Sequence, residues 1–241
     1  MDKKLLHGVH TALITPMKDG EVSYGDLENL ISKQIDGNVS GLVPCGTTGE
    51  SPTLCKDEHL EVIRQTIGMV NGKVPVIAGT GANSTQEALF LTENADQAGA
   101  DAFLIVAPYY NKPSQDGLFA HFSAIAKRTD KPIVLYSIPS RCGIEISTDT
   151  VKRLRENHPH ICALKEAGGR SSKVSETVVA LDSDFTVLSG DDGLTLPFMA
   201  CGAKGVVSVA SNLIPQKVVS LVSLALEGKF IDAQKIHLEN Y

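Results

Sequence analysis

The feature of this sequence that most restricts its fold is a regular alternation of short apolar runs with longer amphipathic segments. Runs rich in valine and isoleucine are typical of strands, and the longer segments have the 3.6-residue period of helices. The runs predict eight strands, at residues 9–15, 41–45, 74–79, 102–107, 133–138, 161–165, 186–189 and 205–209. The segments between them predict helices at residues 24–36, 57–70, 85–98, 116–127, 148–156, 174–181 and 195–201.

Strands that alternate with helices in this way form parallel sheets. Eight such units, with no linker and no change of composition between the two halves, favour a closed (β/α)8 TIM barrel of the α/β class over an open sheet. A last barrel helix is predicted at residues 215–226, and residues 231–241 begin a further helix that then stops. We therefore expect a catalytic barrel over residues 1–228 and the start of a truncated C-terminal helical region over residues 229–241.

Composition excludes several classes of protein. The net charge is -6 and no cluster of basic residues stands out, which disfavours nucleic acid or a membrane surface as a partner. No apolar run approaches the roughly 18 residues of a membrane span, and His7, Gly8 and His10 interrupt any export signal, so we expect a cytoplasmic protein. The 5 cysteines are odd in number and lack paired spacing, which favours reduced thiols over disulfides or a zinc site.

Lys165 is the candidate nucleophile, because it lies in the apolar run at residues 161–165. In a strand it shares a face with Ala163 and Ile161. An apolar setting penalises the ammonium form, which lowers the pKa and leaves neutral amine able to attack a carbonyl carbon and form a Schiff base. On this run alone, a strand-end lysine whose charged head reaches water is an equal alternative.

Polar residues at other strand ends favour the catalytic alternative, because active sites of such barrels lie at the carboxyl ends of the strands. The second strand ends in a tight turn, Gly46 to Glu50, whose backbone N–H groups and two threonine hydroxyls can hold a carboxylate. The fourth ends in a loop with Tyr109 and Tyr110, and the fifth in one with Tyr136 and Arg141. Tyrosine can relay protons, and arginine binds a carboxylate with two parallel hydrogen bonds.

Other loops exclude certain ligands. Asp191 and Asp192 follow the seventh strand where many barrels bind phosphate, and these carboxylates disfavour a phosphorylated substrate. The run Gly79-Thr80-Gly81 has half of a dinucleotide fingerprint at the wrong spacing and predicts a turn. The scattered histidines give no pattern for a metal site, and no metal is expected.

Four motifs together closely resemble the dihydrodipicolinate synthase (4-hydroxy-tetrahydrodipicolinate synthase) family, of the N-acetylneuraminate lyase or class I aldolase superfamily. They are Gly46-Thr47-Thr48-Gly49-Glu50, Pro108-Tyr109-Tyr110-Asn111-Lys112-Pro113, Leu135-Tyr136 with Pro139-Ser140-Arg141, and Lys165-Glu166-Ala167. The resemblance runs from about Gly8 to the last residue. It implies condensation of pyruvate with L-aspartate 4-semialdehyde in lysine and diaminopimelate biosynthesis, with no cofactor beyond the imine on a lysine, by a homodimer or a tetramer of two dimers.

The resemblance also implies roles for individual residues. Lys165 matches the Schiff-base lysine, Tyr136 the residue that moves protons, and Thr48, Thr47 and Tyr110 the rest of the relay, with Tyr110 reaching a neighbouring subunit's site. The backbone at Thr47 and Thr48 would hold the pyruvate carboxylate, Gly190 and Val207 would line the pocket, and Arg141 would bind the second substrate. A lysine-binding regulatory site is implied at Ser51, Pro52, Lys56, His59, Asn83, Glu87 and Tyr109, and we expect partial inhibition by lysine.

Some positions depart from the family pattern. Ser137 and Cys142 stand where asparagine and threonine are frequent, Lys56 stands where histidine is frequent, and family members usually continue beyond Tyr241. The nearest alternative is a sister aldolase, such as N-acetylneuraminate lyase or a keto-deoxy-sugar-acid aldolase, which shares the lysine and tyrosine. Arg141 and Thr48 argue against it, since those enzymes bind polyols. A catalytically silent pyruvate-binding barrel is a further alternative that the intact relay disfavours.

Overall fold

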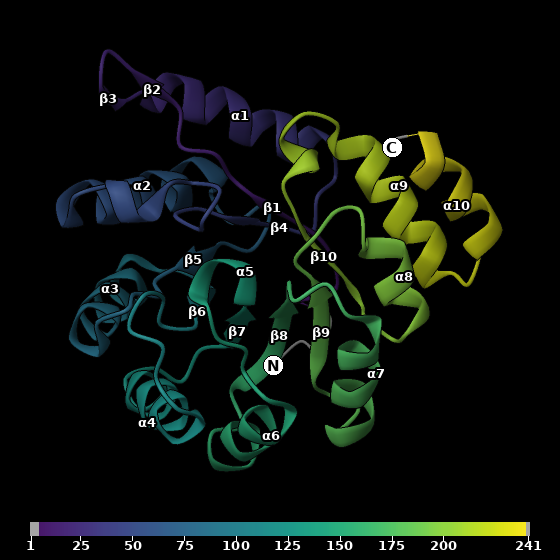
Figure 1. Cartoon of the computed structure of the whole chain (residues 1–241). Coiled ribbons are helices and arrows are strands. Elements are labelled where there is room, and N and C mark those ends of the chain that lie inside the picture. The colour runs from purple at the N-terminus through teal and green to yellow at the C-terminus, as the bar shows by residue number, and fades with distance from the viewer. Residues whose placement is uncertain (1–4, 240–241) are drawn as a thin grey trace.

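The computed structural model describes residues 5–239, so the last two residues of the predicted terminal helix lie outside the described range. Eight parallel strands form one sheet in the order β4-β1-β10-β9-β8-β7-β6-β5. In Figure 1 these strands occupy the middle of the molecule and the helices surround them. The strands are β1 (Gly8–Ala12), β4 (Gly41–Val43), β5 (Ile77–Gly79), β6 (Ala102–Val106), β7 (Ile133–Ser137), β8 (Ile161–Glu166), β9 (Thr186–Ser189) and β10 (Gly205–Ser208).

The two ends of this sheet meet, which closes the barrel. Leu42 of β4 forms a parallel bridge with Val76, and its amide donates to the Pro75 carbonyl at 2.9 Å. Gly79 lies on the same seam, and a Cβ there would come 2.2 Å from the Cys45 carbonyl oxygen, so only glycine lets the two strands approach. The predicted TIM barrel is therefore confirmed, and the glycines after β5 serve close backbone approach.

The predicted helices are also present, with shifts of a few residues at their ends. They are α1 (Tyr24–Asp36), α2 (Lys56–Val70), α3 (Thr85–Ala98), α4 (Gln115–Ala126), α6 (Thr148–Asn157), α7 (Ser171–Ala180), α8 (Thr195–Ala200), α9 (Pro215–Leu226) and α10 (Phe230–Glu239). The largest shift is in α7, which begins before the predicted start at residue 174 because Lys173, a polar residue, belongs to its buried face. Helix α10 packs outside the ring, against α8 and α9 (Figure 1).

Serine side chains fix the starts of three helices. Ser84, Ser114 and Ser147 each accept a hydrogen bond from the backbone N–H three residues later, at the starts of α3, α4 and α6. Such caps satisfy amides that have no partner within the helix. They also set where each loop ends and each helix begins.

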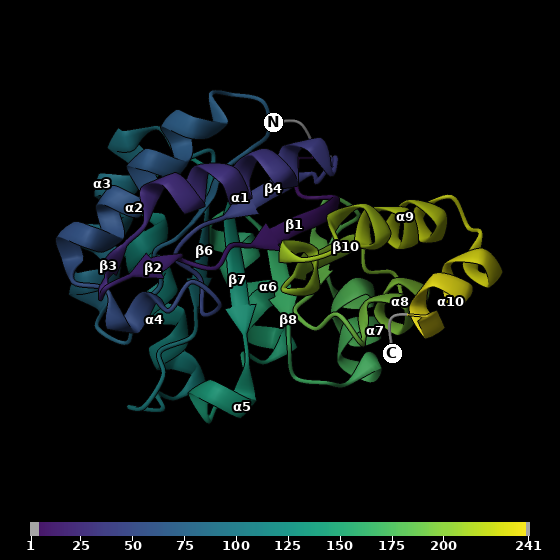
Figure 2. The ribbon, with the colours of Figure 1, turned by 90° about the horizontal axis from the view of Figure 1, so that it is seen from above.

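Several short elements were not predicted from the sequence. A hairpin of β2 (Met17–Lys18) and β3 (Glu21–Val22) precedes α1, 3-10 turns η1 (Ser51–Thr53) and η2 (Ala210–Asn212) follow β4 and β10, and α5 (Pro139–Cys142) follows β7. Hydrophobic periodicity cannot detect elements shorter than one period. In Figure 2 the arrow of β7 points toward α5, which marks the carboxyl end of the barrel.

Two further findings concern the chain as a whole. All five cysteines are free thiols, as the odd count and spacing predicted. Within residues 5–239, no helix combines the length and the apolar character needed to cross a membrane.

Candidate active site

Lys165 lies inside the barrel near the end of β8 and is only 5% exposed. It pairs in register with Tyr136 of β7, so the two side chains leave the sheet side by side on the same face. The lysine Nζ atom lies 3.9 Å from the centroid of the tyrosine ring. The structure therefore places the two residues expected to do the chemistry next to each other.

Burial lowers the pKa of Lys165 to about 7, the Asp192 carboxylate opposes that shift, and the Arg141 guanidinium adds to it. Desolvation dominates because an ammonium ion without water around it is costly, whereas a neutral amine is not. Near neutral pH a large fraction of the side chain is consequently the nucleophilic amine. This agrees with the expectation drawn from the apolar run.

Tyr136 connects the lysine to the turn after β4. Its side chain hydrogen-bonds with that of Thr47, and both residues line one small cavity above β4, β5 and β6. Burial raises the pKa of Tyr136, while the Thr47 hydrogen bond and the Arg141 charge lower it. The phenol stays protonated near neutral pH and can donate or accept a proton through this hydrogen bond.

The turn after β4 is held in an unusual backbone conformation. Cys45 and Glu50, at its two ends, have φ values of 54° and 58°, and the Thr15 hydroxyl donates to the Gly49 carbonyl at 2.7 Å. Non-glycine residues in this region carry strain that persists only where the surroundings enforce it. No hydrogen bond among the described residues uses the amides of Thr47 or Thr48. These two donors, with the half-buried threonine hydroxyls, can receive a carboxylate.

Arg141 lies in α5 and is exposed at the carboxyl end of the barrel. Its charge adds to the lowering of the Lys165 pKa by burial and opposes the raising of the Tyr136 pKa by burial, so it lies near both groups. Within residues 5–239, no carboxylate or carbonyl group binds the guanidinium. It is available to bind an acidic substrate.

Gly190 and Val207 complete the wall around the lysine. A Cβ at Gly190 would lie 3.1 Å from the Lys165 Cε atom, so glycine leaves room for the lysine to move. Glu166, Ser189 and Val206 pair with one another across β8, β9 and β10. Since successive residues point to opposite faces, Val207 shares the inner face with Lys165.

Asp192 was interpreted from the sequence only as a residue that repels phosphate. Its carboxylate accepts hydrogen bonds from the Ser208 hydroxyl at 2.5 Å and from the amides of Val209 and Ala210 at 2.9 and 3.0 Å. The residue thus joins the loops after β9 and β10 and places a negative charge near Lys165. Two adjacent aspartates at a strand end were the only signal of this role in the sequence.

Tyr110 is a relay candidate that the single chain leaves at the surface. It is 89% exposed, and its backbone is held at a φ of 74°. Its neighbour Tyr109 is partly buried and hydrogen-bonds to the backbone of Asn83. A large aromatic ring presented to solvent on a constrained backbone is typical of a protein interface.

A second pocket lies beside the first, between η1, α2 and α3. It gathers every candidate regulatory residue except Asn83, and it is lined by Ser51, Pro52, Lys56, His59, Glu87 and Tyr109 together with Leu54, Gly81, Ala82 and Leu91. Burial, and after it the Glu87 carboxylate, raise the pKa of Tyr109. Burial lowers the pKa of His59, and the hydrogen bond with the Gly79 carbonyl and the Glu87 charge oppose that shift. The Lys56 Nζ atom lies 5.7 Å from the centroid of the Phe90 ring.

The first site can perform amine chemistry on a ketone. A lysine with a lowered pKa, a tyrosine that moves protons, amide donors for a carboxylate and a guanidinium for a second carboxylate gather at the carboxyl ends of β4, β7 and β8. Among the described residues, no group of three His, Cys, Asp or Glu side chains is arranged to hold a metal ion.

Known proteins that are similar to this chain in sequence and in structure belong to one family. The family model described as the dihydrodipicolinate synthetase family matches residues 5–240. A curated protein of Sulfurihydrogenibium sp., named 4-hydroxy-tetrahydrodipicolinate synthase, is 50% identical over 233 residues, which are 97% of this chain and 80% of that protein. The solved structure of the 4-hydroxy-tetrahydrodipicolinate synthase of Methylacidiphilum fumariolicum SolV has a TM-score of 0.96 and 53% identity, over 97% of this chain and 78% of that one. The crystal structure of dihydrodipicolinate synthase from Aquifex aeolicus has a TM-score of 0.96 and 50% identity, over 97% of this chain and 80% of that one.

Proposed function

The chain belongs to the dihydrodipicolinate synthetase family, and on this basis we propose that it condenses pyruvate with L-aspartate 4-semialdehyde. This is the reaction of a Schiff-base-forming lyase in lysine and diaminopimelate biosynthesis. The observation that carries the proposal is the buried Lys165 beside Tyr136, with an amine pKa of about 7.

The lysine would begin the reaction. Its amine nitrogen attacks the ketone carbon of pyruvate, and loss of water gives an imine. Removal of a proton from the methyl carbon gives an enamine, which forms a carbon–carbon bond to the aldehyde carbon of the semialdehyde. The reaction needs no cofactor other than this imine.

The other site residues would hold and protonate the reactants. Tyr136, hydrogen-bonded to Thr47, would exchange protons with the carbinolamine and the enamine, and Thr48 would continue that relay. The amides of Thr47 and Thr48 would hold the pyruvate carboxylate, between Gly190 and Val207. Arg141, free of protein acceptors among the described residues, would bind the carboxylate of the semialdehyde.

We propose a homo-oligomer, a dimer or a dimer of dimers, because the exposed Tyr110 completes the relay only in a neighbouring subunit. A cytoplasmic location fits a role in amino-acid biosynthesis. The division into a catalytic barrel over residues 1–228 and a helical region from residue 229 stays a proposal. Gly228, with a φ of 78°, separates α9 from α10 and supports that boundary.

The second pocket is proposed as a regulatory site for lysine. Glu87 would bind the effector's amine, and Asn83 and Tyr109 its carboxylate. Lys56 would attract that carboxylate or repel the amine, depending on where its ammonium group lies.

One assay tests the proposal against its alternatives. Purified chain should consume pyruvate and L-aspartate 4-semialdehyde together, and it should not cleave N-acetylneuraminate or a keto-deoxy sugar acid. Cleavage of either sugar acid without condensation would identify a sister aldolase. Imine formation with neither reaction would identify a pyruvate-binding barrel.

A substitution at Tyr136 tests its role in proton transfer. Tyr136→Phe should slow both imine formation and condensation, and lower kcat by about a hundredfold to ten-thousandfold, the usual contribution of a general acid or base. Tyr24→Phe, on the half-buried first turn of α1, is the matched control and should retain activity.

A further inference from the structure

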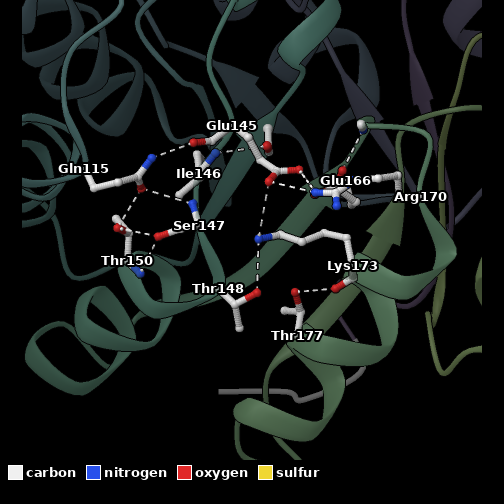
Figure 3. A network of polar contacts seen from close by, with 12 residues as sticks. Gln115, Glu145, Ile146, Ser147, Thr148, Thr150, Glu166, Arg170, Lys173 and Thr177 are labelled. Atoms are coloured by element: carbon white, nitrogen blue, oxygen red, sulfur yellow. Dashed lines mark hydrogen bonds and ion pairs between the residues drawn. The ribbon is translucent and has the colours of Figure 1, made fainter.

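A cluster of charged residues lies behind the catalytic strand, on the face opposite Lys165. Glu166 follows Lys165 in β8, so its side chain points out of the barrel, and it is 0% exposed. Figure 3 shows it near Glu145, with Arg170 approaching from the loop before α7 and Lys173 from α7 itself. The proposed reaction assigns none of these four residues a role.

Glu145 is the residue that the two cations share. The Arg170 Nη2 atom donates to both oxygens of the Glu145 carboxylate, at 2.7 and 2.9 Å. The Lys173 Nζ atom lies 4.0 Å from the Glu145 carboxylate and donates to the Thr148 hydroxyl at 3.0 Å. Because Lys173 is only 2% exposed, the Glu145 carboxylate and the Thr148 hydroxyl take the place of water around its side-chain nitrogen.

The segment that contains Glu145 continues directly from α5, which carries Arg141. Its backbone is held at several points. The Ile146 amide donates to the Ser137 hydroxyl at 3.3 Å, and Gln115 of α4 donates to the Glu145 carbonyl at 2.8 Å. The side chain of Glu145 links residues 143–147 to Arg170, which precedes the first residue of α7, and to Lys173 within α7.

The turn after β8 fits tightly between the two carboxylates. The Gly168 amide donates to the Glu166 Oε1 atom at 2.6 Å. A Cβ on Gly168 would lie 2.5 Å from that oxygen and 3.5 Å from the Glu145 Oε1 atom. Strand β8, the turn and the segment after α5 are therefore packed against one another with little freedom.

We propose that Glu145, bound by Arg170 and Lys173, is a positioning residue that fixes the segment carrying Arg141 relative to the catalytic strand. This inference rests on the proposed function, in which Arg141 binds the carboxylate of L-aspartate 4-semialdehyde. Glu145 touches no substrate. It sets the distance between the guanidinium on one loop and the nucleophile on the next strand.

The inference predicts an effect on one substrate only. Pyruvate is held by the turn after β4 and by β8, which is paired with β7 and β9 along its length, whereas the semialdehyde depends on Arg141, whose segment Glu145 ties to Arg170 and Lys173. Loss of the ion pair should therefore raise KM for the semialdehyde and leave imine formation at Lys165 unchanged. A general loss of folding would affect both.

Arg170→Gln is the most informative variant, because it removes the ion pair with Glu145 with little risk of unfolding the chain. The Arg170 side chain is 55% exposed, and its removal leaves no buried charge without a partner. The matched control is Arg153→Gln, which breaks an ion pair with Asp116 between α6 and α4 where the arginine side chain is 47% exposed. We expect Arg170→Gln to raise KM for the semialdehyde about three- to tenfold. Arg153→Gln should change it less than twofold, Glu145→Gln should repeat the effect, and Arg170→Lys should restore part of it.

A second measurement does not depend on turnover. Hydrogen exchange of the amides in residues 143–147 should be faster in Arg170→Gln than in wild type, and unchanged in Arg153→Gln. Wild-type chain that fails to condense the two substrates would refute the proposed function, while the exchange comparison would still decide whether Arg170 holds this segment. Equal exchange in both variants, or a parallel fall in borohydride trapping of pyruvate, would overturn the positioning role.

Discussion

The Nζ atom of Lys165 lies 3.9 Å from the centre of the Tyr136 ring, and the two residues are direct partners in the pairing of β8 with β7. The contact follows from register: a shift of either strand by one residue would turn one side chain out of the barrel. The ring helps to exclude water from the amine, which contributes to the burial that lowers the lysine pKa to about 7. A proton donor and a neutral nucleophile thus lie together in the resting protein.

Imine formation should follow the ionisation of Lys165. The neutral amine predominates above its pKa of about 7, so the rate of borohydride trapping with pyruvate should rise between pH 6 and pH 8 with a midpoint near that value. Mass analysis should find the adduct on the peptide that contains Lys165. Lys165→Arg should form none, because a guanidinium stays protonated.

The exposed Lys204→Arg is the control for this experiment and should trap pyruvate as wild type does. An adduct on a different lysine would remove Lys165 from the mechanism. A midpoint near pH 10 would show that burial does not lower its pKa in solution.

Tyr110 should act in a neighbouring subunit's site. Mixing Tyr110→Phe chains with Lys165→Ala chains should recover part of the activity, because a mixed dimer contains one site with both an intact lysine and an intact partner tyrosine. The measurement is turnover of the mixture compared with each variant alone. Inactive mixtures that demonstrably contain mixed dimers would contradict the prediction.

The control mixture combines Tyr136→Phe with Lys165→Ala. Both residues belong to one barrel, so no mixed dimer contains a complete site. This mixture should stay as inactive as its components.

Glu166 should make the fold less stable as pH rises. Burial, and to a smaller extent the Glu145 carboxylate, raise the pKa of Glu166 to about 7 from 4.5, against the effect of the Gly168 hydrogen bond, Lys173 and Arg170. The folded chain therefore binds the proton more tightly than the unfolded chain, and the stability from this group is lost between about pH 4.5 and pH 7.

Glu166→Gln keeps the acceptor for Gly168 without the charge. It should be more stable than wild type at pH 8, by about 1–3 kcal/mol, and close to wild type at pH 4.5. Thermal unfolding at the two pH values measures this difference. The exposed Glu156→Gln should show no such dependence on pH, and a Glu166→Gln variant less stable than wild type at pH 8 would reverse the assignment.

Lysine should inhibit partially through the second pocket. Like charges about 4 Å apart repel by roughly 4 kcal/mol at an effective dielectric of about 20, enough to abolish millimolar binding, so the position of Lys56 decides the response. The other residues that line the pocket suit the effector, so we expect binding to remain possible. Rates measured against rising lysine test this, and Lys56→His should increase the inhibition by removing the fixed charge.

Two results would contradict this prediction in different ways. A flat response in wild type that becomes inhibition in Lys56→His would show that the charge closes the site. A flat response in both would show that the pocket does not bind lysine.

The sequence by itself determined the architecture and the chemical groups. Valine- and isoleucine-rich runs alternate with helical segments, and these runs predict the strands to within a few residues. Only a closed barrel leaves eight such parallel strands without an edge, so the same pattern also favours closure. Lys165, Tyr136, Thr47, Thr48 and Arg141 could be named because each lies in a short motif at a strand end. The depressed pKa of Lys165 was also expected, since the run around it is apolar.

Only the tertiary structure decided how groups from distant segments meet. The approach of Gly79 to Cys45, the bonds from Asp192 to the loop after β10 and the pairing of Glu145 with Arg170 join parts of the chain that no local pattern connects. An aspartate or an arginine in a loop has the same appearance in a sequence whether water or a buried partner surrounds it. Its effect depends on distance and on the exclusion of water, and both are set by the closed barrel, not by neighbouring residues.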